Sequence, residues 1–429
     1  MAYKFNNGYG WLTEAVYDEH ANIGTNPNRY TERMLDFMPN GGVRRLQHHG
    51  LKANGVYGKV DNLHISYEGN RIATVFEDAG TVTQNGSMDY PGGNREMAFG
   101  YNGWGALVMD ESRGITEISY DRSGNPMRIS FTDGSITENV YSESGEKLIT
   151  RYSGTLTSPM LPDSQTSPVP HLIQTVEYHG NVIYRDGKVD MVLFPGGYAT
   201  INGSAVTFHY YTQDYLGNNR AVINGSTGAI EQTVAYYPYG GVIADLGTGQ
   251  LSGQPYKFGG KELITANGLN EYDFGARWYY SAVPFFTKPD SYCEKYYWLS
   301  PYLYCGNNPI NFSDPTGKII EMPSGSTTEQ IMTVMWNMQQ ITNDRLVFNT
   351  QKDGTIRIKI ASLGEGRLTD GTRLVRRLNS SKKKVTINVV GDKDNGTIDT
   401  NKENATNYKG SDVTLRFNPR NDPYIPLKD

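Results

Sequence analysis

The chain has 429 residues, a formal net charge of −5 and a sequence pI near 5.9. This charge balance argues against a broadly cationic nucleic-acid-binding or membrane-surface protein. No apolar run approaches the roughly 20 residues of a membrane span, and the start, MAYKFNNGYG, lacks the charged and apolar regions of a signal peptide. Glycine, with 48 residues, and tyrosine, with 31, favour sheets with tight turns. Because Cys293 and Cys305 are the only cysteines, no disulfide framework holds the fold, and two unpaired thiols are the favoured interpretation.

The first half of the chain predicts a series of β-hairpins. Strand-like segments alternate with Gly or Asn turns up to about residue 100, as at 36–50 and 61–72. Three tyrosine units follow, spaced 19 and 21 residues apart: Tyr101-Asn-Gly-Trp-Gly, Tyr120-Asp-Arg-Ser-Gly-Asn and Tyr141-Ser-Glu-Ser-Gly-Glu. In each unit we expect the tyrosine to cover the sheet while Asn or Asp and Gly form the turn, and one hairpin alone is unstable. Carbohydrate binding by exposed tyrosines is an alternative, but packing within a sheet is favoured.

The next segments predict a loop, further strands and no catalytic histidine. A stretch rich in Pro, Ser and Thr at 153–170 predicts a surface loop or disordered excursion. Turns are expected at Gly187 and Gly196, and a strand begins near His209, which we interpret as a packed sheet residue. The pair His48-His49 beside Gly50 is interpreted as part of a solvated loop in preference to a metal site.

Residues 236–317 are expected to organise the fold. Tyr, Gly and Pro recur without a 3.6-residue apolar period, which predicts short strands and tight turns. The ordered motifs PYG, FGGKEL, GLNEYDFGARWYY and SPYLYCGNNPINFSDPTG resemble the core domain that closes RHS (YD-repeat) shells, of the Bacteroidetes type. The resemblance implies a mainly β fold, a partial cocoon-like shell of hairpins around a polymorphic C-terminal effector, as in bacterial RHS toxins and insecticidal toxin complexes. The expected domains are a repeat shell at 1–235, the core at 236–317 and a variable α+β domain at 318–429.

The same resemblance implies a self-cleavage site at the end of the core. Asp290 and Asp314 match the two carboxylates of an aspartyl self-protease. In such a site one carboxylate acts as a base, and a second group protonates the leaving side of the scissile bond. However, Pro284-Phe285-Phe286 stands where the family has Gly-Arg-Phe, so the arginine that would hold a carboxylate ionised is missing. Ser291 replaces a proline, and Lys318 replaces the apolar residue after the terminal DPTG. The favoured alternative is that both aspartates cap local turns.

After residue 317 the composition changes, and an α+β arrangement is predicted. Ser326-Thr-Thr-Glu329 is a capping box before an amphipathic helix at 331–341. A hairpin is expected where RLVFNT and TIRIKI flank Lys-Asp-Gly, and a short helix at 371–380. Strands are expected at 385–390 and 412–417. A basic cluster of Arg373, Arg376, Arg377 and Lys382 to Lys384 is interpreted as a solvated face in preference to a nucleic-acid patch.

The last hundred residues also resemble the leading half of HExxH effector metallopeptidases attached to RHS cores. In such enzymes two histidines one helical turn apart bind zinc and the intervening glutamate activates water. All seven histidines lie before residue 210 and no HExxH occurs, so no metal site and no cofactor are expected in this chain. Since the chain starts within a repeat and ends before such a zinc helix, it is expected to be a fragment with a truncated effector.

Together these resemblances imply a structural shell segment that encloses or presents its own C-terminal effector in interbacterial competition. The implied partners are that effector, an immunity protein and secretion-system components, with no nucleic acid and no membrane span. Secretion or cell-surface placement by a dedicated system is expected. Two alternatives are a zinc metallopeptidase toxin whose catalytic half is missing and a cell-surface glycan- or protein-binding module.

Overall fold

The computed structural model describes residues 2–6, 10–17, 29–52, 54–79, 89–155, 170–243, 254–296, 299–318, 342, 344–350, 356–363, 372, 376, 385–389, 396–399 and 413–417. The chain divides into two compact units, Met1–Phe5 with Trp11–Pro323, and Asn6–Gly10 with Ser324–Asp429. Strands dominate the described residues, which confirms the mainly β fold class. The three-domain division at residues 235 and 317 stays a prediction.

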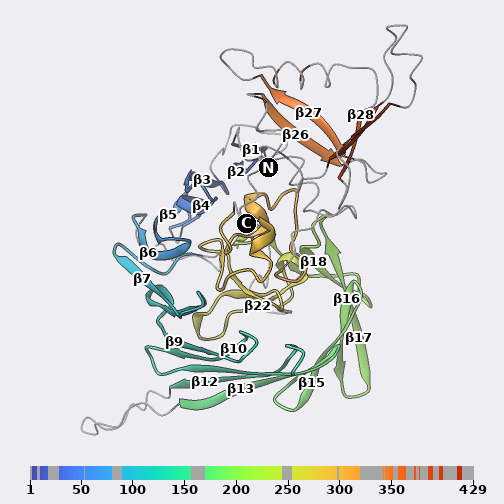
Figure 1. The fold of residues 1–429 in the computed structure, drawn as a ribbon. Helices are drawn as coiled ribbons and strands as arrows, with labels where there is room; N and C mark the ends of the chain where they lie inside the picture. The colour runs from blue at the N-terminus through green and yellow to red at the C-terminus, as the bar shows by residue number, and fades with distance from the viewer. Residues whose placement is uncertain are drawn as a thin grey trace. The chain divides into compact units, whose positions relative to one another are not determined.

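Nineteen strands of the first unit form one antiparallel meander, in which each strand pairs with the next along the chain (Figure 1). Their bounds are β1 Ala2–Phe5, β2 Leu12–Val16, β3 Glu32–Phe37, β4 Val43–Leu51, β5 Tyr57–Glu68, β6 Arg71–Glu77, β7 Glu96–Tyr101, β8 Leu107–Asp110, β9 Ile115–Tyr120, β10 Pro126–Phe131, β11 Ile136–Tyr141, β12 Lys147–Thr155, β13 Pro170–His179, β14 Val182–Arg185, β15 Lys188–Phe194, β16 Gly197–Asn202, β17 Ala205–Gln213, β18 Asn219–Asn224 and β19 Ile230–Thr233. A short 3-10 helix, η1 Glu111–Arg113, lies between β8 and β9.

The tyrosine units form the predicted hairpin turns, and one side chain organises each turn. In the middle unit Asp121 accepts hydrogen bonds at Oδ1 from the amides of Ser123 and Asn125, both at 2.8 Å. Gly124 adopts a φ of +79°, a conformation that costs glycine little. The turn after β17 repeats this pattern, with Asp214 accepting from the amides of two residues further along and Gly217 at a φ of +82°. The predicted turns at Gly187 and Gly196 are also present. Within the predicted loop at 153–170, strands β12 and β13 stay paired as far as Thr155. Residues 156–169 lie outside the described residues.

Residues 236–317, hereafter the core segment, form short strands and 3-10 turns as predicted. The strands are β20 Ala235–Tyr236, β21 Val242–Ile243, β22 Glu262–Ile264, β23 Glu271–Asp273, β24 Trp278–Tyr280 and β25 Phe285–Phe286, and the 3-10 helices are η2 Phe258–Gly260, η3 Ala266–Gly268, η4 Cys293–Tyr296 and η5 Cys305–Asn307. Several of its rings are less than 2% exposed, namely Tyr237, Tyr239, Tyr272, Tyr279, Tyr280 and Phe286. Burying a large aromatic side chain stabilises a fold by about 1.5–3 kcal/mol, so this aromatic cluster is a principal source of stability.

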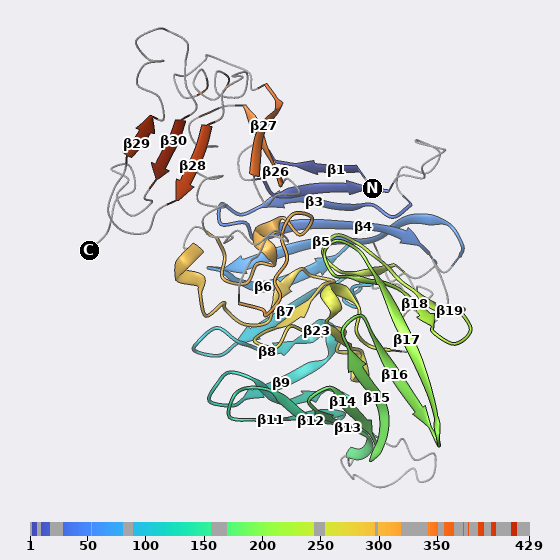
Figure 2. The ribbon, with the colours of Figure 1, turned by 90° about the vertical axis from the view of Figure 1, so that its right-hand side faces the viewer.

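The core segment binds strands that lie far apart along the meander. Figures 1 and 2 show the sheet passing from β3 through β12 to β18 around the segment, drawn in yellow. Three tyrosine hydroxyls of the segment donate to backbone carbonyls: Tyr237 to His49 at 2.6 Å, Tyr302 to Gly105 at 2.7 Å and Tyr236 to Asn219 at 2.7 Å. Two cations outside the segment donate to its carboxylates: Arg113 to Glu271 at 2.5 Å, and Lys147 to Glu262 and Asp273, both at 2.7 Å. One aromatic segment thus contacts the sheet at several points between β4 and β18.

Charges at the turn before β18 and on β18 act on the first strand of the meander. Partial burial raises the pKa of the Tyr3 hydroxyl on β1, and the charges of Arg220 on β18 and of Asp214 act on the same hydroxyl. Tyr215 in turn responds to Tyr3, because burial first and then Tyr3 raise the pKa of Tyr215 to about 12. The sheet therefore curves until its first strand is within electrostatic reach of the turn before β18.

The second unit contains the predicted hairpin and strands. β26 Arg345–Thr350 pairs antiparallel with β27 Ile356–Ser362. β28 Val385–Val389 pairs parallel with β30 Val413–Phe417, and β29 Gly396–Asp399, which the sequence did not indicate, pairs antiparallel with β30. The predicted helix at 331–341 lies outside the described residues. Thr372 and Arg376, from the predicted helix at 371–380, are both helical.

One member of the basic cluster is not simply solvated. Arg376 donates from Nε and Nη2 to the two carboxylate oxygens of Asp344, at 2.6 and 2.5 Å. The Asp344 side chain is fully buried, so this pair orients the helical residue against the start of β26. The other five basic residues lie outside the described residues, as Arg373 and Lys382 illustrate.

Candidate functional site

Asp290 and Asp314, the two predicted site residues, meet at one buried guanidinium. Arg277, immediately before β24, contacts Asp290 Oδ2 at 2.8 Å and Asp314 Oδ2 at 3.1 Å, both through Nη2. The three side chains are 2%, 10% and 1% exposed. Asp290 follows β25 and Asp314 follows η5, so the fold joins residues from three separate turns of the core segment.

The remaining donors of Arg277 are also used. Nη1 donates to the Pro301 carbonyl at 3.1 Å, and Nε donates to the Gly317 carbonyl. The guanidinium carbon lies 3.6 Å from the centroid of the Phe286 ring, a cation–π contact in a desolvated setting. Burial lowers the pKa of Arg277 and the two carboxylates oppose this shift, so the group stays charged at neutral pH.

The other carboxylate oxygens cap turns. Asp290 Oδ1 accepts from the Tyr292 amide at 2.8 Å. Asp314 Oδ1 accepts from the amides of Gly317 at 2.7 Å and Lys318 at 3.1 Å. The turn-capping interpretation is therefore confirmed. The inference that no arginine holds these carboxylates is wrong, because Arg277, within the motif GARWYY, does so in place of an arginine at position 285.

Burial and charge in this cluster act on the Asp290 carboxyl and on a neighbouring thiol. Burial raises the pKa of Asp290, Arg277 counteracts that shift, and the charge of Asp314 adds to it. Burial also raises the pKa of the nearby Cys305 thiol well above its usual range, and Asp314 reinforces this effect. Cys293 and Cys305 are both free, which confirms the expectation of unpaired thiols. The cluster can hold the residues around Gly317 in place, and it keeps one carboxyl, that of Asp290, easier to protonate than usual.

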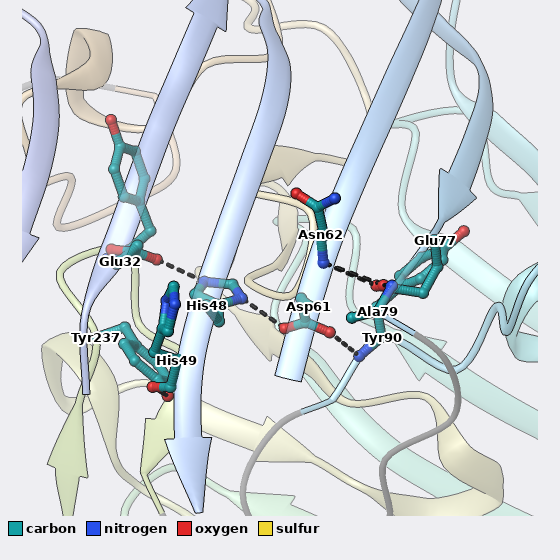
Figure 3. A network of polar contacts seen from close by, with 10 residues as sticks. Glu32, His48, His49, Asp61, Asn62, Glu77, Ala79, Tyr90 and Tyr237 are labelled. Atoms are coloured by element: carbon teal, nitrogen blue, oxygen red, sulfur yellow. Dashed lines mark hydrogen bonds and ion pairs between the residues drawn. The ribbon is translucent and has the colours of Figure 1, made fainter. Parts of the chain in front are cut away.

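A second buried ionic network lies on strands β3 to β5, where the only sequence signal was the pair His48-His49. Figure 3 shows His48 between Glu32 and Asp61, with contacts of 2.8 Å from Nε2 and 2.6 Å from Nδ1. Burial would lower the pKa of His48, but hydrogen bonds and charges of Asp61 and Glu32 raise it to about 10. His48 is thus a buried imidazolium, and the expectation of a solvated loop is wrong.

The period of β4 was the available signal for this network. Leu46, His48 and Gly50 alternate with Gln47 and His49, so the two-residue period of a strand turns His48 to the buried face. Both ring nitrogens of His48 are occupied by carboxylates, which excludes metal ligation in this arrangement. Among the described residues no group of three or more His, Cys, Asp or Glu side chains is arranged to bind a metal ion.

The network continues to the core segment and to further acids. Tyr239 donates its amide to Glu32 Oε2 at 3.2 Å, and the Tyr237 ring lies 4.7 Å from the His48 ring. On the other side, the Tyr90 amide donates to Asp61 Oδ1 at 3.0 Å. Burial and the charge of Asp61 raise the pKa of the neighbouring Glu77 to about 7.

His209 is a packed sheet residue, as predicted. It is 7% exposed and stacks on Tyr198 at a centroid distance of 4.5 Å. Its ring contacts Glu231 at 2.5 Å and Thr200 at 2.9 Å.

In the part of the chain that the structure describes, no helix is long and apolar enough to cross a membrane.

Comparison with known proteins places these features beside much longer chains. No family model matches. Salivary gland surface protein 1 of Aedes aegypti is 33% identical over 106 residues, which are 25% of this chain and 3% of that protein. Similar solved structures include the crystal structure TcdB2-TccC3-TEV, with 14% identity, a TM-score of 0.42 and coverage of 73% of this chain and 18% of the other. A Photorhabdus luminescens Tc holotoxin pore has 14% identity, a TM-score of 0.40 and coverage of 76% and 18%. The chain therefore spans less than a fifth of the length of each of these proteins.

Proposed function

We propose that this chain is a structural shell segment of the RHS type, whose aromatic core segment holds a curved hairpin sheet in shape. The observation that carries the proposal is the set of contacts from one segment to β4, η1, β12 and β18, which lie up to 170 residues apart (49 to 219). Within the sheet each strand forms ladder hydrogen bonds only with its sequence neighbours, so contacts from one segment to distant strands are what tie these strands together over a long range.

The finer parts of the proposal rest on the motif order of the core segment. A shell of this type would enclose or present the C-terminal residues as an effector used in competition between bacteria. An immunity protein and a secretion machinery would be its partners, and its place would be outside the producing cell. The described unit supports the structural role, and the effector role is an extension from the resemblance.

Protease protection tests enclosure of the C-terminal unit. If residues 324–429 are enclosed, trypsin should cut the basic stretch 373–384 at least tenfold more slowly in the native full-length chain than after heat denaturation. Mass spectrometry of timed samples identifies each cut. Cutting of this stretch in the native chain at the denatured rate would refute enclosure and leave only a scaffolding role for the sheet.

We infer that Arg277, Asp290 and Asp314 hold the turns of the core segment together, and we call these three residues the clasp. Self-cleavage at this cluster is the second candidate function. The pKa of Asp290, raised by burial, and the proximity of Asp314 are features that an acid–base pair requires. Against this, Arg277 Nη2 and the backbone amides already bind both carboxylates. We therefore expect the purified chain to keep its intact mass of 47.8 kDa.

Intact mass spectrometry after prolonged incubation at pH 5 and pH 7 distinguishes the two. A fragment ending at Lys318, lost in the variant Asp290→Asn, would establish self-cleavage and overturn the clasp. The variant Asp121→Asn, in a surface turn far along the sequence, is the matched control and should behave as the parent in either case.

A further inference from the structure

Strands β15 to β19 have two faces of opposite character. On one face Tyr198 and His209 are buried, and the Tyr211 hydroxyl reaches Gln254 of the core segment. Because side chains alternate along a strand, the intervening residues lie on the opposite face, away from the core segment. That opposite face carries large apolar side chains that stay exposed.

The strand register makes these side chains one continuous surface. Phe194, Gly197, Tyr210, Ile223 and Ile230 stand opposite one another in a row across five strands. A second row pairs Val192 with Ala199 and Phe208, and a third pairs Ile201 with Val206. None of these residues is charged. We call the large apolar members of this surface the apolar face: Phe194, which is partly buried, and the exposed residues Ile201, Val206, Phe208, Tyr210 and Ile230.

The apolar face is well exposed and internally packed. Ile201, Val206, Phe208, Tyr210 and Ile230 are 43%, 50%, 48%, 48% and 63% exposed. The Phe194 ring meets the rings of Phe208 and Tyr210 edge to face, at centroid distances of 6.1 and 5.9 Å. Rings held by one another lose little conformational entropy when a partner covers them. Contiguous apolar surfaces of this kind mark interaction sites on soluble proteins.

The occupant can be inferred from charge and area. Across a twofold axis, residue i of one copy meets residue j of the other and the reverse, and only residues near the axis meet their own equivalents. A face without charges can therefore meet its own copy without like-charge repulsion. Aromatic side chains bury about 150–250 Å² each and aliphatic ones less, so the five half-exposed side chains together with Phe194 offer on the order of 500 Å². Two copies would bury about 1,000 Å², the lower size limit of a specific interface.

We propose that the apolar face docks against the same face of a second copy of this chain, sheet on sheet. Two such faces pack about 10 Å apart with their strands roughly aligned, an arrangement common between β-sheets. The small area predicts a dimer that exchanges with monomer in the micromolar range.

Sedimentation velocity of the full-length chain over a concentration series tests this inference. The parent should shift from monomer to dimer as the concentration rises, and Phe208→Lys should weaken the dimer at least tenfold, because it buries an unpaired charge from each copy in an apolar interface. Since the Phe208 side chain is half-exposed, the thermal unfolding of the Phe208→Lys variant should match that of the parent. The matched control is Met127→Lys on β10. Met127 is 41% exposed and lies outside the apolar face, so this variant should leave the dimer intact.

Three results would overturn the inference. One is a chain that stays monomeric throughout the series. Another is a dimer that Phe208→Lys and Met127→Lys affect equally. The third is a monomer whose apolar face binds neutral phosphatidylcholine vesicles in a Phe208-dependent way, which would assign the face to a lipid surface. Because the core segment contributes no residue to the apolar face, failure of the dimer would leave the proposed shell role untouched.

Discussion

Replacing Arg277 by methionine should lower the free energy of unfolding of the first unit by about 3–5 kcal/mol, the usual cost of removing one partner from a buried ion pair. Methionine fills a similar volume but leaves Asp290 and Asp314 facing each other, 10% and 1% exposed, with no compensating charge. It also removes the hydrogen bonds to the carbonyls of Pro301 and Gly317. Urea unfolding followed by tryptophan fluorescence, which includes Trp278 on the adjacent strand β24, measures the change.

Two companion variants separate the buried cluster from ordinary surface pairing. Arg277→Lys keeps the charge but loses the planar fork that serves two carboxylates and two carbonyls, so an intermediate loss is expected. Arg128→Met removes a pair with Glu138 whose side chains are 47% and 41% exposed, and it should cost less than about 1 kcal/mol. A loss below about 1 kcal/mol for Arg277→Met would show that the clasp does not stabilise the core segment.

The sequence predicted the local structure well because the local signals were strong. The turn at Asp121 and Gly124 depends on one side-chain acceptor and one positive φ, both of which are visible in a single repeat. The same holds for the core segment, whose spacing of Tyr and Gly excludes long helices. In the second unit, alternation sufficed for β28 and β30, whereas the four residues of β29 carried too little pattern.

The buried ionic sites could not be predicted in the same way, because they depend on long-range register. Asp290 and Asp314 were identified by motif, but their partner Arg277 was not assigned a role until the turns of the core segment were seen together. His48 needed two partners, Glu32 on β3 and Asp61 on β5, and no single-sequence pattern fixes the register of three strands. The two-residue period of β4 nevertheless predicts that His48 is buried, although it does not identify the partners of His48.

His48→Gln should lower the free energy of unfolding by about 3–5 kcal/mol at pH 7, because glutamine leaves Glu32 and Asp61 buried without a cation between them. The deficit should be largest near pH 6 and should shrink toward pH 10. Urea unfolding of parent and variant at pH 6, 8 and 10 measures it. His179→Gln is the matched control: its side chain is 62% exposed, and it should cost almost nothing at any of these pH values.

The direction of this pH dependence follows from proton linkage. The pKa of His48 rises from an ordinary 6.5 to about 10 in the folded chain, so the folded state holds a proton that the unfolded state has lost over this window. Stability from His48 is therefore complete below pH 6.5 and disappears as the pH rises through 10. The pKa of Glu77, raised by burial from 4.5 to about 7, makes stability fall with pH over a lower window, and parent and variant share that effect. Burial and the Asp61 carboxylate also raise the pKa of Asp89, and the charge of His48 opposes this shift, so the Asp89 contribution differs between parent and variant. A deficit that stays equal at pH 6 and pH 10 would mean that His48 is neutral in the fold and packs only as a ring against Tyr237.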